Sequence, residues 1–218
     1  MIIVMLGAQG SGKGTVGVRL AEELGLVHVS TGDIFRENIK NNTELGKEAN
    51  TYILAGNLVP DELTNRILQD RLSKDDVLEK GAVIDGYPRT EEQCKTLDEI
   101  LNSLGREVDL AIKLDVDRDE LIKRITTRRV CKSCKEGYNT EYNPPKEEGI
   151  CNKCGGQVVQ RDDDKEDAVK QRLDIYYSNE KTILDYYIAK DKLRVEKAGD
   201  KIGRPSKDVT TYLINELK

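Results

Sequence analysis

Short apolar runs alternate with amphipathic segments along most of the chain. The apolar runs, which are typical of buried strands, lie at residues 1–6, 26–29, 82–84, 110–114 and 193–195. Apolar positions at helical spacing predict helices over residues 16–24, 34–55, 62–72, 90–104, 120–129, 168–187 and 209–217, with breaks in the second near Asn41-Asn42 and at Gly56. Strands that alternate with helices favour parallel pairing through right-handed crossovers. The pattern therefore predicts an α/β fold, interrupted by an irregular stretch at residues 130–160.

The segment from Gly7 to Thr15 joins the first strand to the first helix and is rich in glycine. Such a turn can point backbone N–H groups at one anion, and the helix that follows adds unpaired N–H groups and a positive dipole end. Lys13 adds a charge that can reach outer phosphates, so we interpret the segment as a phosphate-binding loop. Gly14 stands where the general pattern has Ser or Thr, and Thr15 follows it. The alternative is a glycine-rich turn with a surface lysine.

Four of the five cysteines form two C-x-x-C pairs, Cys131 with Cys134 and Cys151 with Cys154, separated by 16 residues. This spacing predicts a zinc site, and four thiolates fill the coordination of the metal, so we expect a structural Zn²⁺. The alternative is four free thiols at chance spacing. Cys94 lies within an expected helix, and we interpret it as a small core residue.

Composition narrows the class of partner. The chain has 218 residues and a net charge of −5, so no global field attracts nucleic acid or acidic membranes. It has no segment long enough to span a bilayer, and Met1 to Leu6 lacks the charged leader of a signal peptide. We expect a cytoplasmic protein with no nucleic-acid or membrane partner.

Taken together, the motifs resemble those of the adenylate kinases, in the long form whose lid carries zinc, from Ile2 to about Leu193. The motifs that carry the resemblance are Gly7 to Thr15, Ser30-Thr31-Gly32-Asp33 with Arg36, Gly56-Asn57-Leu58-Val59-Pro60-Asp61, Asp85-Gly86-Tyr87-Pro88-Arg89-Thr90 with Gln93, Arg124 with Arg128-Arg129, and Arg161-Asp162-Asp163-Asp164 with Arg172. Gln9 replaces the usual proline and Tyr87 the usual phenylalanine, and we expect neither to change the reaction. Residues 198–206 look longer than usual, which blurs the adenine contact expected there.

The resemblance implies a five-stranded parallel sheet of the P-loop nucleoside monophosphate kinase architecture. The expected core comprises residues 1–29, 60–126 and 165–218, with a helical AMP-binding insertion at 30–59 and a zinc-bearing lid at 127–164. The implied reaction is reversible, direct in-line transfer of a phosphoryl group from Mg-ATP to AMP, giving two ADP. Mg²⁺ is the implied cofactor, ATP, AMP and ADP are the implied partners, and we expect a monomer.

Phosphoryl transfer needs positioned cations more than acid–base chemistry, and arginine meets phosphate oxygens in pairs. The resemblance assigns ATP binding to Gly10, Ser11, Gly12, Lys13, Gly14, Thr15, Arg124, Arg128 and Tyr138. It assigns AMP binding to Thr31, Arg36, Asn57, Leu58, Val59, Gly86, Tyr87, Pro88, Arg89, Gln93, Arg161 and Arg172. The expected catalytic residues are Lys13, Asp85, Arg89, Arg124, Arg128, Arg161 and Arg172.

Two of these residues have structural alternatives. Asp85 ends a buried strand, where we expect it to orient magnesium through water, with Thr15 and Asp163 as further candidates; it could instead form the turn before Gly86. Gln93 stands three residues after Thr90, as a helix-capping glutamine would, and the family interpretation instead pairs its amide with adenine.

Two other functions compete with this one. The first is a kinase with UMP or CMP as acceptor or GTP as donor, against which Thr31 and Gln93 favour AMP. The second is a nucleic-acid-binding zinc ribbon on a P-loop scaffold. The expected lid lacks the basic footprint of such a protein, because its lysines alternate with glutamates. These residues are Lys132, Lys135, Lys146 and Lys153 against Glu136, Glu141, Glu147 and Glu148.

Overall fold

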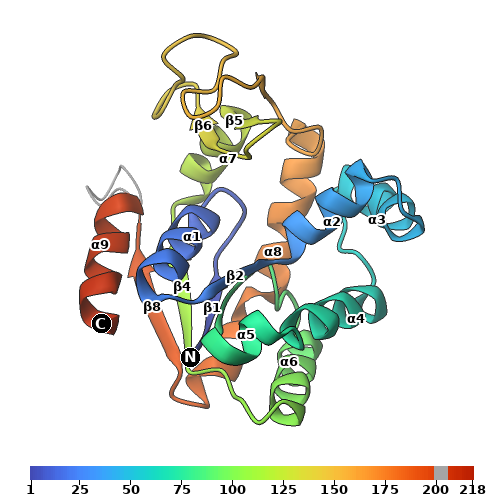
Figure 1. The fold of residues 1–218 in the computed structure, drawn as a ribbon, viewed down its shortest axis with the longest axis vertical. Coiled ribbons are helices and arrows are strands. Elements are labelled where there is room, and N and C mark those ends of the chain that lie inside the picture. The colour runs from blue at the N-terminus through green and yellow to red at the C-terminus, as the bar shows by residue number, and fades with distance from the viewer. Residues whose placement is uncertain (199–205) are drawn as a thin grey trace.

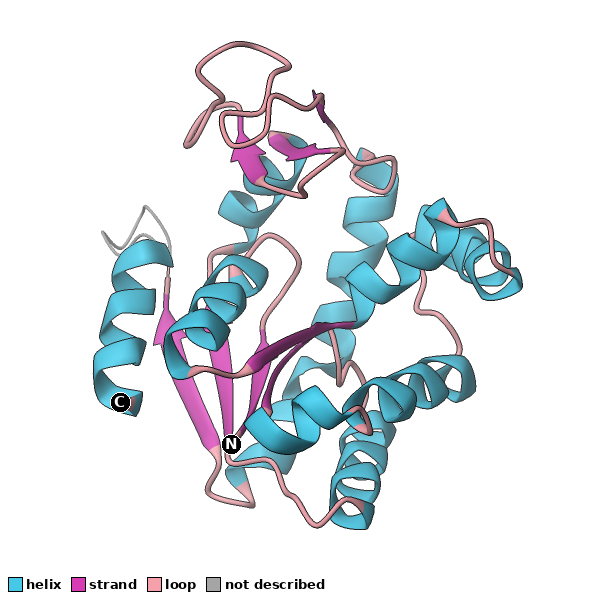
Figure 2. Ribbon diagram, in the orientation of Figure 1, coloured by secondary structure: helices cyan, strands magenta, loops and turns pink. Residues whose placement is uncertain are grey.

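The structure, a computed structural model, describes residues 1–198 and 206–218 and is built on a central parallel sheet (Figures 1 and 2). Its strands are β1 (Ile2–Leu6), β2 (Val27–Ser30), β3 (Ala82–Asp85), β4 (Leu110–Asp115) and β8 (Leu193–Lys197). They lie in the order β2-β3-β1-β4-β8, and each neighbouring pair is parallel. The predicted α/β fold with a five-stranded parallel sheet is confirmed.

Helices cover both faces of the sheet, which is why β1 is apolar and buried at every position. Alternate residues of β1 enter two hydrophobic clusters: Ile2 and Val4 point into one, Ile3 and Met5 into the other. The first cluster packs against α4 (Asp61–Leu72), α5 (Asp75–Lys80), α6 (Glu91–Ser103) and the end of α8 (Glu166–Ile188). The second packs against α1 (Lys13–Leu24), α7 (Arg118–Thr126), α9 (Ser206–Leu217) and the start of α8.

Two smaller units are attached to this core (Figure 1). Helices α2 (Thr31–Lys40) and α3 (Glu44–Leu54) pack around Phe35 and Ala49, and Asn42, with φ 53°, lies in the predicted break between them. Beyond the carboxyl ends of the core strands, β5 (Arg128–Cys131), β6 (Gly137–Asn139) and β7 (Val158–Val159) form an antiparallel sheet in the order β6-β5-β7.

One helix was predicted to end three residues later than it does in the structure. The predicted helix over 120–129 is α7, Arg118–Thr126, and Arg128 and Arg129 lie in β5 instead. Asp117 caps the helix two residues earlier than predicted by accepting a hydrogen bond from Asp119 N at 3.0 Å, and Arg129 pairs with Tyr138 across the small sheet. Helix α5 and the three lid strands were not predicted, because they are short and carry few apolar residues. No described helix has the length and apolar character needed to cross a membrane.

Candidate active site

The predicted phosphate-binding loop runs from the carboxyl end of β1 to the first residue of α1. Gly12 immediately precedes that helix with φ 90°, a left-handed conformation that a residue with a side chain adopts at a cost. Lys13 is the first helical residue, and its Nζ lies 3.3 Å from the carbonyl oxygen of Ala8 in the same loop. The loop therefore has the strand–turn–helix context that a phosphate-binding motif requires.

The surroundings of Gly14 explain why glycine stands where the general loop pattern has Ser or Thr. A Cβ at this position would lie 3.2 Å from Oδ2 of Asp85, so a side chain here would crowd that carboxylate. Asp85 ends β3, which neighbours β1, and its backbone stands opposite Met5. Its Oδ1 is buried and has no hydrogen-bond partner among the described residues. An orphaned carboxylate oxygen beside a phosphate-binding loop fits a hydrated Mg²⁺, which favours oxygen ligands and keeps several waters.

Basic side chains gather at this loop from segments far apart in the sequence. Burial lowers the pKa of Lys13 to about 8; Asp85 opposes this shift, and Arg89, Arg128 and Arg161 add to it. Mutual repulsion of this kind arises only where cations are close together. The structure thus brings together four of the predicted catalytic cations at one point.

Arg36 and Arg172 join the same group. The pKa of Arg89 is lowered first by burial and then by Arg172 and Arg36. The pKa of Arg161 is lowered to about 10, first by burial and then by Arg128 and Arg36. So many neighbouring cations favour the binding of an anion with several charges, such as a polyphosphate.

Carboxylates fix several of these arginines in place. Asp164, whose side chain is fully buried, accepts hydrogen bonds from Nε of Arg128 at 2.8 Å and from Nη2 of the same residue. Asp163 lies 3.0 Å from Nη1 of Arg172. Burial raises the pKa of its carboxyl, but the surrounding arginines have the larger effect, so the pKa is lower than usual. Arg124 pairs with Glu120 one helical turn earlier. A phosphoryl group can be positioned for transfer only by cations that are themselves fixed, and these guanidinium groups are.

The residues expected to bind AMP lie around the turn after β3 and the pair α2–α3. Oγ1 of Thr31 donates to the carbonyl oxygen of Gly86 at 3.0 Å, and Nε of Arg89 donates to the same oxygen at 2.7 Å. Arg36 pairs with Asp33 at 2.7 Å. The structure thus places Thr31, Arg36 and Arg89 around one turn. Val59 is buried beside α2 and α3, and Oδ1 of Asn57 accepts from Gln171 at 3.3 Å. The ring of Tyr87 is buried in the core beside the sheet, and its hydroxyl donates to Asn65 at 2.7 Å.

The backbone N–H of Gln93 donates to Oγ1 of Thr90 at 3.1 Å, so Thr90 caps α6 as its spacing predicts. The side chain of Gln93 does not complete a capping box. Its Oε1 accepts from the N–H of Arg89 at 2.7 Å, and its Nε2 donates to Oδ1 of Asp61 at 2.6 Å. The predicted contact with adenine stays a prediction.

The lid brings the four predicted zinc ligands together. Their Sγ atoms all lie within 4.8 Å of one another, and the distances Cys131–Cys154 and Cys134–Cys151 are both 3.5 Å. Tetrahedral zinc with bonds of about 2.3 Å requires sulfur–sulfur distances of about 3.8 Å, so four soft thiolate donors in this arrangement fit Zn²⁺. Cys94 is buried in the core, as predicted.

Tyr138 was predicted to bind ATP. Its ring is buried in the lid cluster, its hydroxyl oxygen lies 3.3 Å from Sγ of Cys151, and the same oxygen accepts from Asn152 N at 2.8 Å. The hydroxyl therefore supports the cysteine cluster in the manner of an outer-shell partner. A contact with ATP stays a prediction.

Two contacts at the site have no counterpart in the sequence analysis. Nε2 of Gln9 donates to Oδ1 of Asp164 at 3.2 Å, so the phosphate-binding loop is linked to the carboxylate that fixes Arg128. A proline at position 9 could not make this bond. Asp61 holds the amide of Gln93. Each contact joins residues distant in sequence. The only sign of either in the sequence is that Gln9 replaces the usual proline.

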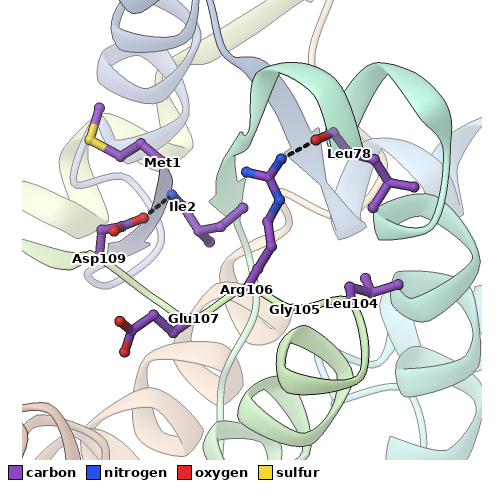
Figure 3. A pocket seen from close by; sticks show the side chains of 8 residues that line it. All are labelled: Met1, Ile2, Leu78, Leu104, Gly105, Arg106, Glu107 and Asp109. Atoms are coloured by element: carbon purple, nitrogen blue, oxygen red, sulfur yellow. Dashed lines mark hydrogen bonds between the residues drawn. The ribbon is translucent and has the colours of Figure 1, made fainter.

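A hollow lies at the opposite end of the sheet from the loop, near the start of β1 (Figure 3). Its volume is about 600 Å³, and its charged side chains bind protein groups. Asp109 accepts from Ile2 N at 2.5 Å, Arg106 donates to the carbonyl oxygen of Leu78, and Glu107 pairs with Lys192 at 2.5 Å. The hollow therefore lacks the gathering of neighbouring cations that marks the site at the loop.

A parallel sheet that presents a phosphate-binding loop and a group of arginines between two attached units defines a nucleoside monophosphate kinase of the P-loop class. The chain matches the family model described as Adenylate kinase over residues 5–192. It is 44% identical to an adenylate kinase of Caldicellulosiruptor bescii over 213 residues, which are 98% of this chain and 99% of that protein. It is 46% identical to one of Acetivibrio thermocellus (98% of each chain), and 47% identical to one of Thermoanaerobacter pseudethanolicus (88% of each). The chain belongs to the adenylate kinase family, as its motifs predicted, and the reaction of this family is phosphoryl transfer between ATP and AMP.

The pKa of Lys13 leads to a prediction about pH. Bound polyphosphate favours the charged amine, so the protonated protein binds ATP more tightly and the affinity falls as the pH rises through about 8. Between pH 7 and pH 9 we expect a loss of up to about tenfold, which calorimetric titration with ATP measures directly. In Lys13→Arg, whose side chain stays charged, the slope should flatten. An equal slope in both proteins would show that another group titrates.

Proposed function

We propose that this chain catalyses reversible transfer of the γ-phosphoryl group of Mg-ATP to AMP with the residues gathered at the loop. The observation that carries the proposal is that Arg89, Arg128 and Arg161, from three separate segments, lie close enough to Lys13 for their charges to add to the effect of burial and lower its pKa. Catalysis of such transfers consists of holding two anions in line and stabilising the charge spread over the transferred group. Fixed cations do both.

The positions of these residues suggest which of them bind ATP and which bind AMP. Lys13, Arg124 and Arg128 lie on the side of the loop and the lid, where the phosphates of ATP would bind. Arg36 and Arg89 lie around the turn after β3, where the phosphate of AMP would bind, and Arg161 and Arg172 lie between. Asp85 would hold Mg²⁺ through water, with Thr15 and Asp163 as candidates to assist, and the metal would neutralise charge between the outer phosphates.

A coupled assay tests the proposal. Wild-type protein with Mg-ATP is given AMP, CMP, UMP or GMP in turn, and then AMP with GTP as the donor. We expect AMP with ATP to give the highest kcat/KM. Preference for UMP or CMP, or for GTP, would support the competing kinase, and no transfer to any acceptor would overturn the proposal.

We further propose the division into a core, an AMP-binding region at 30–59 and a lid at 127–164, with the last two closing over the nucleotides. Closure of a lid in adenylate kinase is a known example of such motion, and its chemical reason is that water must not compete for the phosphoryl group. A two-headed ATP–AMP mimic should therefore reduce the radius of gyration in solution scattering. An unchanged radius at saturating mimic would contradict closure.

We also propose a monomeric cytoplasmic enzyme with a structural zinc in the lid and no nucleic-acid or membrane partner. The cysteine cluster offers a complete tetrahedral donor set, so the metal would have no open position for chemistry. Size-exclusion chromatography with light scattering tests the proposed oligomeric state, and a mass twice that of the chain would overturn it.

A further inference from the structure

The side chain of Gln93 lies between two partners of opposite hydrogen-bonding character. The peptide N–H of Arg89 can only donate, and it donates to Oε1 at 2.7 Å. The carboxylate of Asp61 accepts from Nε2 at 2.6 Å. Gln93 is only 2% exposed, so water cannot take the place of either partner. A primary amide can turn its oxygen and nitrogen around at little cost in water, but not here.

The reversed amide would meet two mismatches. Its nitrogen would face the N–H of Arg89, donor against donor, and its oxygen would face Asp61, acceptor against acceptor. The oxygen and nitrogen of the Gln93 amide, which are buried, would then both lack a partner, and this costs more than a missing hydrogen bond in water. Asp61 also occupies the first position of α4, where the helix dipole stabilises its negative charge.

The fixed amide still has one N–H and one oxygen lone pair to offer. A 6-aminopurine presents the complement, because its amino group donates and its N1 accepts. A 6-oxopurine presents the reverse, since its O6 accepts and its N1–H donates, and it would need the reversed amide. This step rests on the proposed function, in which Gln93 contacts the base of the acceptor nucleotide.

We propose that Asp61 is a positioning residue that fixes the orientation of the Gln93 amide and thereby makes the acceptor site select 6-amino over 6-oxo bases. The 6-oxo class includes hypoxanthine, guanine and, by the same pattern at its 4-position, uracil. The selection acts through Gln93, and Asp61 itself need not touch the nucleotide.

AMP and IMP are the sharpest probes, because they differ only at position 6 and in the proton on N1. The ratio of their kcat/KM values is measured with Mg-ATP for wild type, Asp61→Leu and Asp61→Asn. We expect wild type to prefer AMP by at least about 100-fold, since a site that hydrogen-bonds polar groups rejects mismatched analogues strongly. Asp61→Leu should lower this ratio at least about tenfold. Asp61→Asn should restore most of the ratio, because its side-chain oxygen can still accept from Gln93.

Glu62→Leu is the matched control. Glu62 is the other acid in the first turn of α4, it is exposed, and its removal alters the helix terminus without reaching Gln93. Its AMP-to-IMP ratio should equal that of wild type, and thermal melting shows which variants remain folded.

The outcomes separate the two proposals. If wild type transfers phosphate to AMP but uses IMP equally well, the orientation proposal fails whatever the variants do. If wild type prefers AMP and Asp61→Leu, while folded, keeps the ratio, the proposal also fails and the proposed function stands. If wild type transfers phosphate to neither nucleotide, both are overturned.

Discussion

Replacing Lys13 with methionine is expected to lower phosphoryl transfer by at least about 100-fold while leaving the fold intact. Methionine is unbranched like lysine and only one atom shorter, and it removes the charged amine. Loss of one positioned charge beside a transferring group costs about 3–4 kcal/mol of transition-state stabilisation. The amine would lose its 3.3 Å hydrogen bond to Ala8 O and its attraction to Asp85. Its removal also relieves repulsion from Arg89, Arg128 and Arg161, which offsets those losses in the free protein, so we expect the fold to stay intact.

Initial rates in both directions and a thermal melt test this prediction. Lys192→Met is a suitable control, because Lys192 pairs with Glu107 at the far end of the sheet. The control should keep wild-type turnover. A folded Lys13→Met protein with turnover within about threefold of wild type would remove Lys13 from the transfer step.

Much of the fold could be predicted because its strands and helices are encoded by local patterns. The apolar run at β1 and the glycines after it specify a buried strand followed by a sharp turn, and both are seen where the sequence places them. The break between α2 and α3 was visible in Asn41-Asn42, since asparagine tolerates the left-handed conformation seen at Asn42. Periodicity could not place the end of α7, because pairing with Tyr138 draws Arg129 into a strand.

For the site, the sequence could predict which residues take part but not how they are arranged. Motifs identified the arginines, but burial and charge decide how they act on Lys13, and these depend on where distant segments meet. The bonds from Gln9 to Asp164 and from Gln93 to Asp61 span 155 and 32 residues, and no local pattern specifies either. The position of Gly14 beside Asp85 likewise became understandable only when β1 and β3 were seen as neighbours.

The metal in the lid gives the second large effect. The buried cluster of the lid consists of Cys131, Tyr138, Cys151 and Val158, with Cys134 packed against it, so three of its five members are proposed zinc ligands. The strands around it have four, three and two residues. So small a unit cannot bury enough apolar surface to fold by itself. Binding of zinc at four thiolates supplies about 10–16 kcal/mol in small zinc-binding peptides, and that energy becomes folding energy.

Removal of zinc should therefore unfold the lid and spare the sheet. Elemental analysis should find one zinc per chain in the purified protein, and chelation under reducing conditions should lower the first melting transition. Hydrogen exchange should rise at residues 128–159 and stay slow in β1, β3 and β4. The affinity for ATP should fall at the same time, because Arg128 begins β5 and loses its fixed place opposite Asp164 when that strand melts. Some turnover should survive at low temperature, since Lys13 and Arg89 are held by the core.

Cys154→Ser should reproduce these changes, and added zinc should reverse them in the chelated wild type but not in the variant. If the protein holds no zinc, and added zinc alters neither melting nor ATP affinity, then the cysteines have another purpose and the lid must draw its stability from contacts with the core.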